Sequence, residues 1–354
     1  MLRDLLRVLG SSDRRDGRNL TREEAHRAFS AILDGEAGEI QTAAFLVAMR
    51  WKGVTVEELV GFASAARERA RLPCAGMGGL VCVSPPQDGY DGLPPLEVAA
   101  GFVAAGAEAR VLLVADRNVP PRRGVTAADV LDHLGGGLAW DPGQVEDQVE
   151  RTGFGAIAAS GMLPAWLPLR KVRGEVGVRT PMATVEKLVV PPTAAVVFGA
   201  QHGPVLGTAV ETMAGLGHPS GIALQGLDGG VIPNLKRRTR GVELAGNHQV
   251  PLTVEPNDFG LGSGGNPELP MYGPPDEGQG SGDNPHLVRA AGEAVAGVLH
   301  GETGCNRNAT LLCASVILKA VGRKPTLAEG VDAAIESLES GAALDVFERY
   351  RAIS

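Results

Sequence analysis

The stretch from Val81 to Ala100 reads Val-Cys-Val-Ser-Pro-Pro-Gln-Asp-Gly-Tyr-Asp-Gly-Leu-Pro-Pro-Leu-Glu-Val-Ala-Ala. Its first three residues form a short apolar run typical of a strand, a turn rich in Gly, Pro and Asp follows, and Leu96 begins a helical pattern. The first N–H groups of a helix lack internal partners and carry positive partial charge, so strand, loop and helix in this order can bind phosphate. The position of this loop therefore favours a phosphate site.

The side chains of the same loop oppose that function. Four prolines remove backbone donors from it, namely Pro85, Pro86, Pro94 and Pro95. Three carboxylates would repel an anion, namely Asp88, Asp91 and Glu97. Whether the protein is an enzyme depends on this conflict.

The composition describes an ordinary globular protein of 354 residues, 44% of them apolar and 21% charged. Aromatic residues make up only 4%, so Ala, Val and Leu must form the core, while 49 Gly and 24 Pro specify many turns. The formal net charge of -8 argues against a uniformly basic nucleic-acid binder but leaves local basic patches possible.

The sequence predicts a cytoplasmic protein with no membrane partner. No apolar run approaches the roughly 20 residues of a membrane helix, and the N-terminus, with Asp4, lacks the design of a signal peptide. The four cysteines form no C-x-x-C pair, so we expect reduced, buried thiols.

Residues 1–70 are expected to be helical. Thr21 and Glu24 form a capping box, and Thr55 can cap a further helix over residues 56–71. The segment 40–51 is apolar over most of its circumference, which predicts burial between helices or between two subunits. An independent helical bundle is the alternative.

Further along the chain, strands are predicted at residues 109–115, 156–160, 193–199 and 221–225, with helices between them. This alternation favours a largely parallel sheet covered on both faces. The predicted elements after it are a long loop over 260–285, helices over 285–299, 308–321 and 326–340, and a tail at 345–350.

Nine segments carry a family resemblance. They are Leu20-Thr-Arg-Glu-Glu-Ala, Ala31-Ile-Leu-Asp-Gly-Glu, Gln41-Thr-Ala-Ala-Phe-Leu-Val-Ala-Met-Arg, Lys52-Gly-Val-Thr-Val-Glu-Glu-Leu, Gly124-Val-Thr-Ala-Ala-Asp-Val-Leu-Asp-His-Leu-Gly, Arg173-Gly-Glu-Val-Gly-Val-Arg-Thr, Pro256-Asn-Asp-Phe-Gly, Gly304-Cys-Asn-Arg-Asn-Ala-Thr-Leu-Leu-Cys-Ala and Leu327-Ala-Glu-Gly-Val-Asp-Ala-Ala-Ile-Glu-Ser-Leu-Glu-Ser-Gly-Ala. In this order they resemble anthranilate phosphoribosyltransferase, a transferase of tryptophan biosynthesis, over nearly the whole chain.

The resemblance implies an α/β protein of the nucleoside phosphorylase/phosphoribosyltransferase fold. It has a small N-terminal helical domain and a larger α/β domain with a mostly parallel sheet covered by helices. We expect the helical domain at residues 1–72 and the α/β domain at 73–354, with part of 160–200 completing the helical domain. The family further implies an active site between the domains and a homodimer formed through the N-terminal helices.

Phosphoribosyl transfer from phosphoribosyl diphosphate requires backbone donors for the diphosphate, carboxylates for Mg²⁺ and a pocket for the acceptor. The family's Gly-Thr-Gly-Gly-Asp loop matches the segment that begins at Ser84, which lacks those glycines. Its Lys-His-Gly-Asn-Arg motif retains Asn118 but has Asp116 in place of histidine. Of its metal-binding Asp-Glu pair only Asp228 is present, and Arg173 matches the arginine that faces anthranilate.

These matches give the candidate site residues of the enzyme hypothesis. The substrate-binding candidates are Asn118, Arg173, Asp88 and Gly89, and the metal candidate is Asp228. Mg²⁺ is a possible cofactor although the family's ligands are not retained. Because all three parts differ together, we expect altered or absent anthranilate activity in a divergent member of the family.

A second resemblance accompanies the altered parts. It is carried by Asp88-Gly-Tyr-Asp-Gly, Thr184-Val-Glu-Lys-Leu-Val-Val-Pro and Gly226-Leu-Asp-Gly-Gly-Val-Ile-Pro-Asn-Leu-Lys-Arg-Arg. These segments resemble paralogues of anthranilate phosphoribosyltransferase that share the fold but lack the synthetic activity, and some of those paralogues bind nucleic acid.

The alternative function is therefore nucleic-acid binding through basic loops. Four cations occur within five positions, at Lys236, Arg237, Arg238 and Arg240, and we expect them on an exposed loop. A second group follows the 109–115 strand, at Arg117, Arg122 and Arg123, and such loops meet at one end of a parallel sheet. Together they could contact phosphates, or they could be a solvated charge run. The ligand is then either a phosphorylated small molecule or a nucleic acid.

Overall fold

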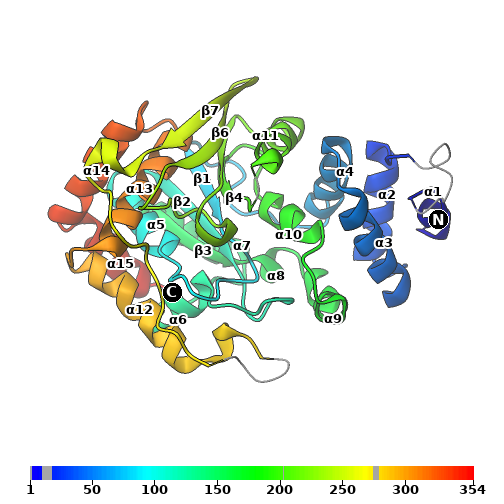
Figure 1. Ribbon diagram of the computed structural model, residues 1–354, viewed down its shortest axis with the longest axis horizontal. Helices are drawn as coiled ribbons and strands as arrows, with labels where there is room; N and C mark the ends of the chain where they lie inside the picture. The colour runs from blue at the N-terminus through cyan, green and yellow to red at the C-terminus, as the bar shows by residue number, and fades with distance from the viewer. Residues whose placement is uncertain (1, 10–17, 202, 274–278) are drawn as a thin grey trace.

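The computed structural model describes residues 2–9, 18–201, 203–273 and 279–354. A group of helices formed by the start of the chain stands beside a larger body in which helices surround a sheet (Figure 1). The predicted combination of a small helical part and a larger α/β part is therefore confirmed.

The N-terminal helices are α1 (Leu2–Leu9), α2 (Arg22–Leu33), α3 (Glu39–Lys52) and α4 (Val56–Arg67). Both predicted capping boxes are present. The Thr21 hydroxyl accepts from the Glu24 amide, and the Thr55 hydroxyl accepts from the Glu58 amide. Helix α4 ends at Arg67, four residues before the end that the sequence predicts.

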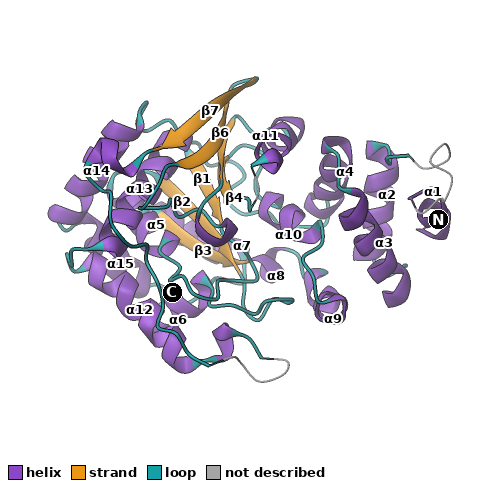
Figure 2. Ribbon diagram, viewed as in Figure 1, coloured by secondary structure: helices purple, strands orange, loops and turns teal. Residues whose placement is uncertain are grey.

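The sheet has seven strands in the order β3-β2-β1-β4-β5-β6-β7. Their bounds are β1 Leu80–Ser84, β2 Arg110–Ala115, β3 Phe154–Ala158, β4 Ala195–Gly199, β5 Ser220–Leu224, β6 Thr239–Ala245 and β7 His248–Val254. The first five strands are parallel, as predicted, whereas β6 and β7 form an antiparallel hairpin at one edge that the sequence analysis did not predict (Figure 2).

Helices cover both faces of the sheet. Their bounds are α5 Glu97–Gly106, α6 Ala127–His133, α7 Pro142–Thr152, α8 Ala159–Met162, α9 Trp166–Val176, α10 Met182–Val185, α11 Pro204–Gly215, α12 Pro285–Leu299, α13 Cys305–Ala320, α14 Leu327–Glu339 and α15 Ala342–Arg351, with short 3₁₀ turns at Glu186–Leu188, Leu227–Gly229, Pro256–Phe259 and Ser281–Asp283. The expected tail at 345–350 is wrong, because it lies within α15. Of the loop expected at 260–285, residues 274–278 lie outside the described residues.

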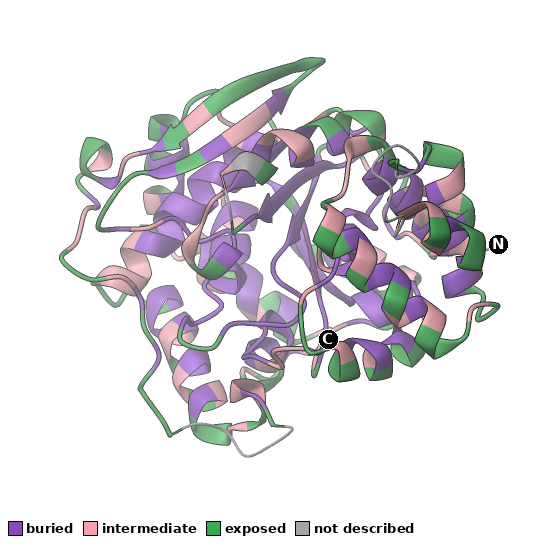
Figure 3. Ribbon diagram, turned by 45° about the vertical axis from the view of Figure 1, so that its right-hand side comes forward, coloured by how far each residue is buried: buried purple, intermediate pink, exposed green. Residues whose placement is uncertain are grey.

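Successive strand residues point to opposite faces, so the sheet separates two apolar cores. On β1, Val81 and Val83 belong to the core beneath α5 and the C-terminal helices. Leu80 and Cys82 belong to the core shared with the N-terminal helices and α11. The strands of the parallel sheet are buried, whereas the outer surfaces of the helices are exposed (Figure 3).

The second core joins segments far apart in sequence. Phe29 and Phe62 of the N-terminal helices pack in it together with Trp166 of α9 and Phe198 of β4. Helices α9 and α10, which lie within residues 160–200, contact α3 and α4 respectively. We propose on this basis the division into 1–72 and 73–354. Within the described residues, no helix is both long and apolar enough to cross a membrane.

Candidate functional site between the helical and α/β parts

The loop that follows β1 is buried and uses its own polar groups. The Gly89 amide donates to the Pro86 carbonyl (3.0 Å), and the Tyr90 amide donates to the Val125 carbonyl (2.9 Å). Gly89 has a φ of 74°, and a Cβ there would clash with the backbone of Gly124, so this tight crossing needs glycine. The Gly89 carbonyl accepts from Arg122 (2.9 Å). Both backbone groups of the candidate Gly89 are thus engaged within the chain.

Asp88 of this loop is only 1% exposed and faces an arginine. Arg179 donates to it from Nε and Nη2, at 2.7 and 2.6 Å, in a bidentate pair. This substrate-binding candidate therefore lies at the cleft with its charge already compensated.

The metal candidate Asp228 also faces an arginine. Arg122 donates to its two carboxylate oxygens at 2.6 and 3.1 Å, and Asp91 contacts the same guanidinium at 3.2 Å. Among the described residues there is no group of three or more metal-ligating side chains of His, Cys, Asp or Glu. Asp228 supplies the one carboxylate of the predicted metal pair, and both of its oxygens accept from Arg122, so in this arrangement it does not offer a free carboxylate to Mg²⁺.

Arg173 is buried and pairs with Glu186, while its Nε donates to the Pro120 carbonyl at 2.8 Å. Burial raises the pKa of Glu186, and the charge of Arg173 works against that shift. Because its donors are directed to protein groups, Arg173 contributes to a buried ion pair beside the cleft.

The candidate Asn118 and the nearby Asp116, which replaces the family's histidine, have different surroundings. Asp116 is 5% exposed, accepts from the Ser160 amide at 2.9 Å and pairs with Arg170 at 2.7 Å. Asn118 is exposed, with a φ of 52°, and does not line the cavities described below. Asp88, in contrast, lines the first of these cavities and Asp228 the second.

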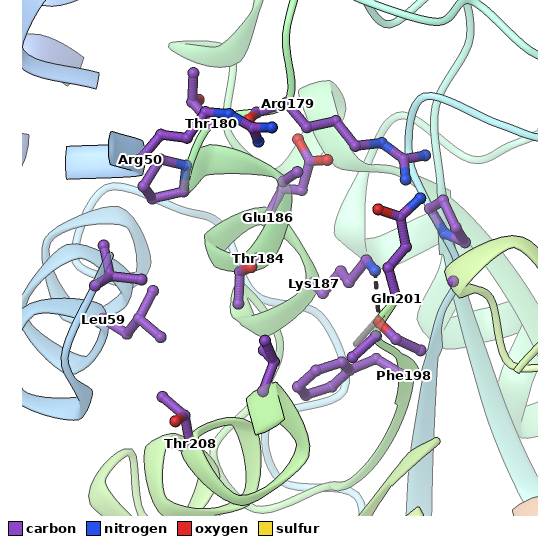
Figure 4. A pocket seen from close by; sticks show the side chains of 18 of the residues that line it. Arg50, Leu59, Arg179, Thr180, Thr184, Glu186, Lys187, Phe198, Gln201 and Thr208 are labelled. Atoms are coloured by element: carbon purple, nitrogen blue, oxygen red, sulfur yellow. Dashed lines mark hydrogen bonds between the residues drawn. The ribbon is translucent and has the colours of Figure 1, made fainter. Parts of the chain in front are cut away.

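A cavity of about 380 Å³ lies where the helical part meets the α/β part (Figure 4). Its apolar wall comes from α4, the β1 loop, β4 and the first turn of α11, through Leu59, Pro86, Phe198 and Val205. We call it the interdomain cavity.

The polar wall of the interdomain cavity comes mainly from residues 179–187. Thr180, Thr184 and Lys187 line it there, and Arg50 lines it from the end of α3. The Lys187 ammonium is buried and donates to the Gly199 carbonyl at 2.8 Å, the bond drawn in Figure 4. Burial, assisted by the charge of Arg179, lowers the pKa of Lys187 to about 8.

Cations outnumber carboxylates around this cavity. Asp88 compensates Arg179, and Glu186 compensates Arg173. Within the described part of the chain, neither Lys187 nor Arg50 forms an ion pair, and the Arg50 guanidinium donates to the Arg179 carbonyl. An anionic ligand would therefore complement the interdomain cavity.

A second cavity of about 740 Å³ lies beyond the ends of β5 and β6. Arg237, Arg238 and Arg240 line it with Asn234 and Asp228, and we call it the basic cavity. The Asn234 side chain accepts from the amides of Lys236 and Arg237, which fixes the turn before β6. The predicted position of Arg240 on a loop is wrong, because Arg240 is the second residue of β6.

The second predicted group of cations, after β2, does not line the basic cavity. Arg117 pairs with Asp129 and Asp132, and Arg122 pairs with Asp228. Arg123 follows in the left-handed conformation, with a φ of 53°. Arg122 does not line the basic cavity itself, but it pairs with Asp228, which does.

Sequence reasoning missed Arg50, Arg179 and Lys187. All three lie in segments that carry the family resemblances, but they were not predicted as site residues. For Arg179 and Lys187 the available signal is a basic side chain next to a threonine-rich segment between two expected elements. Recognising it requires the fold, because the α3 end and residues 179–187 meet only in the tertiary structure.

The sequence matches two family models that together span most of the chain. The helical bundle domain of a glycosyl transferase family matches residues 13–70, and the a/b domain of that family matches residues 96–344. These are the two parts that enclose the interdomain cavity, and the chain belongs to this two-domain glycosyl transferase family.

Curated relatives narrow this class. Anthranilate phosphoribosyltransferase from Rubrobacter xylanophilus is 32% identical over 359 residues, covering 100% of this chain and 98% of the relative. The enzyme of that name from Anaeromyxobacter dehalogenans is 33% identical over 340 residues, covering 93% of each. The chain belongs to the anthranilate phosphoribosyltransferase family.

Solved structures agree with this assignment. Anthranilate phosphoribosyltransferase from Thermus thermophilus superposes with a TM-score of 0.79 at 29% identity, covering 95% of this chain and 96% of that one. The Saccharomyces cerevisiae enzyme, solved in complex with PRPP and Mg, has a TM-score of 0.78 at 17% identity, covering 99% and 97%, and supports the fold alone.

Proposed function

We propose that the protein is a pentosyl transferase that binds a phosphorylated pentosyl donor in the interdomain cavity, and that its activity towards anthranilate is altered or absent. The observation that carries the proposal is the excess of cations around a cavity between the two family domains. The names of the relatives support phosphoribosyl transfer as the reaction class. The cytoplasmic location predicted from the sequence forms part of this proposal.

The roles follow from the contacts. Lys187 and Arg50 would bind the phosphate of the donor, since neither has a carboxylate partner among the described residues. Thr180 and Thr184 would orient its hydroxyl groups. The wall of Leu59 and Phe198 would exclude water from the reacting centre, which strengthens these charge interactions.

Two ion pairs within the protein support the altered activity towards anthranilate. Asp88 already neutralises Arg179 in the loop that matches the family's diphosphate loop, and Glu186 neutralises Arg173, which matches the arginine facing anthranilate. A related enzyme was solved with Mg, but the candidate carboxylate Asp228 is held by Arg122 here, so we assign the ion no step.

Calorimetry with phosphoribosyl diphosphate, with and without Mg²⁺, tests donor binding. We expect binding that weakens about tenfold or more in Lys187→Gln, the loss expected for one charge-assisted hydrogen bond. Lys324→Gln, a surface change far from the cavity in sequence and fold, is the control. No heat at about 1 mM donor, the weak end of useful affinity, would contradict the proposal. An assay with anthranilate then measures the acceptor preference.

The second candidate function is nucleic-acid binding. The observation that favours it is that Lys236, Arg237, Arg238 and Arg240 are exposed and form no ion pair with any described residue. Replacing all four with Ala should weaken binding and reduce its salt dependence, because each phosphate contact contributes a slope of about -0.7 to -0.9. Unchanged affinity, or no shift of DNA or RNA by the parent protein at low salt, would dismiss this candidate.

We also propose a homodimer formed through α3. Ile40, Val47 and Trp51 lie on one face of this helix and are 86%, 41% and 92% exposed. Leu167 on the neighbouring α9 is 43% exposed and extends the apolar surface. A second copy of the chain would cover this surface, in keeping with the apolar circumference that the sequence shows over residues 40–51.

A further inference from the structure

The interdomain cavity and the basic cavity share part of their walls. Gln201 and Gly229 line both cavities. Gln201 is exposed, and Gly229 has no side chain that could form a partition. A ligand that fills one cavity therefore lies next to the other, across two residues.

The basic cavity has the chemistry of a phosphate site. Its arginines, Arg237, Arg238 and Arg240, are exposed and have no carboxylate partner within the described ranges. The carboxylate in its wall, Asp228, is held by Arg122 and so opposes an anion less strongly than a free one would. Guanidinium groups bind phosphate through paired hydrogen bonds.

The interdomain cavity differs from the basic cavity because it has an apolar wall beside its cations, Lys187 and Arg50. Leu59, Phe198 and Val205 form an apolar wall that suits the face of a flat ring. Thr180 and Thr184 offer hydroxyls to its polar edges or to a sugar. Its volume of about 380 Å³ lies in the range of sites for small ligands.

We propose that one ligand occupies both cavities: a nucleoside diphosphate or closely related nucleotide. Its base and ribose lie in the interdomain cavity, and its phosphates lie on Arg237, Arg238 and Arg240 of the basic cavity. This assignment goes beyond the proposed function: the nucleotide would occupy the interdomain cavity in place of the pentosyl donor, so the two ligands exclude each other there. It accounts for an apolar, hydroxyl-lined chamber and an arginine-lined chamber that share Gln201 and Gly229.

The test examines the two halves of the ligand and the two cavities separately. Calorimetry compares ADP, CDP, GDP and UDP with the matching nucleosides and with inorganic tripolyphosphate. Val205→Trp fills the interdomain cavity from an exposed position on α11, and Ala214→Trp, exposed on the same helix outside the cavity, is its control.

The basic cavity has its own pair of variants. The triple variant Arg237→Ala, Arg238→Ala and Arg240→Ala removes the phosphate contacts. A second triple variant, Arg27→Ala, Arg289→Ala and Arg323→Ala, removes the same net charge from other exposed positions. Melting temperatures of all four variants establish that each is folded.

We expect at least one nucleoside diphosphate to bind, and both site variants to weaken it by about tenfold or more, which corresponds to losing one charge-assisted contact or the space for the base. The nucleoside should respond to Val205→Trp alone, and tripolyphosphate to the arginine variant alone. Both controls should bind like the parent.

Three results would overturn the inference. One is that no nucleoside diphosphate binds at about 1 mM, the weak end of useful affinity. Another is that its binding responds to only one site variant. The last is that oligonucleotides bind the parent and Val205→Trp equally well while mononucleotides bind neither. That result would favour the nucleic-acid function instead. If phosphoribosyl diphosphate binds through Lys187 in any of these cases, the proposed transferase function stands without this inference.

Discussion

Glu97, in the first turn of α5, is a fully buried carboxyl group. It has no cationic partner among the described residues, and Tyr90 and Cys313 are buried near it. Burial raises the pKa of Glu97 to about 8. The neutral acid is therefore the form that the fold stabilises.

This pKa shift predicts a stability that depends on pH. A raised folded-state pKa means that stability is complete below the unfolded value near 4.5 and is lost as pH rises through about 8. The loss should reach a few kcal/mol, at about 1.4 kcal/mol per unit of pKa. Glu97→Gln should remove this dependence and be the more stable protein at pH 9. Denaturant titrations at pH 5 and 9, with exposed Glu175→Gln as control, would measure it. Parallel pH profiles in parent and Glu97→Gln would refute the argument.

The Asp88–Arg179 pair gives a second prediction at this scale. Asp88→Asn removes a carboxylate that is 1% exposed and leaves the guanidinium charged. We expect a loss of about 1–3 kcal/mol in unfolding free energy, below the usual cost of breaking a buried pair because Arg179 is partly exposed. The freed Arg179 should bind pyrophosphate more tightly. Calorimetry and thermal melts would test both effects. Asp91→Asn, which frees no buried arginine, is the control, and equal pyrophosphate affinity in the two variants would contradict this role of Asp88.

At the scale of elements, α3 shows how far a sequence pattern can be taken. Its apolar circumference predicted burial between helices or between subunits, and the structure separates these two uses. Phe45, Leu46 and Met49 are in the core, while Ile40 and Trp51 are exposed. Periodicity indicates which residues share a face, but only the packed neighbours show which face has a partner.

The exposed face of α3 predicts the oligomeric state. Trp51→Asp and Val47→Asp together should convert a dimer into a monomer, because two charges would lie in the apolar contact. Sedimentation at micromolar concentration would measure this, with Glu36→Gln as an exposed control on the preceding loop. A parent protein that is already monomeric would rule out the proposed dimer.

The strand pattern was readable for the parallel strands and failed for the hairpin. Strands β1, β2 and β4 are short, buried runs of mainly Val, Leu and Ala bounded by turns, which are strong signals. In contrast, β7 contains Pro251 and is mostly exposed, and β6 follows a basic run. Edge strands tolerate such residues because one side of the hairpin has no strand to pair with. The same difficulty placed Arg240 on a loop.

At the scale of the whole molecule, Arg67 of α4 joins the helical part to the α/β part. It donates to the carbonyls of Leu188 and Leu216, at 2.8 and 3.0 Å, and contacts the ring of His218. His218 is 4% exposed, its Nδ1 lies 2.9 Å from the Ala194 carbonyl, and burial lowers its pKa to about 4. A protonated ring would place a second charge against Arg67.

This contact predicts sensitivity to acid. With a folded-state pKa below the unfolded value near 6.5, the stability is complete above pH 6.5 and is lost as pH falls through about 4. The loss should be about 3–4 kcal/mol, at about 1.4 kcal/mol per unit of pKa. His218→Asn should flatten the profile between pH 6.5 and 4 in denaturant titrations. A His300→Asn control, at an exposed helix end, should leave the parent's slope intact. A slope that persists in His218→Asn would assign it to other groups.

The overall architecture was predictable from the sequence, whereas the contacts of the candidate site residues were not. The family segments and the alternating elements indicated two parts with a cleft between them. The loop after β1 lines the interdomain cavity through Pro86 and Asp88. What Asp88, Arg173 and Asp228 contact could not be deduced, because Arg179, Glu186 and Arg122 come from other segments. Charge pairing across a cleft depends on three-dimensional proximity.

The core shared by the N-terminal helices and the sheet has a consequence for synthesis of the chain. Phe29 and Phe62 leave the ribosome long before Phe198 of β4 and the residues of β5. These later residues form the face of the sheet on which this core packs. About 150 residues separate the end of α4 from the end of β5, so the nascent helices wait roughly ten to thirty seconds at ~5–20 residues per second. During that interval their apolar surface is uncovered. Nascent chains arrested shortly after residue 70 should therefore be clients of ribosome-associated chaperones, and those arrested well beyond residue 250 should be released from them.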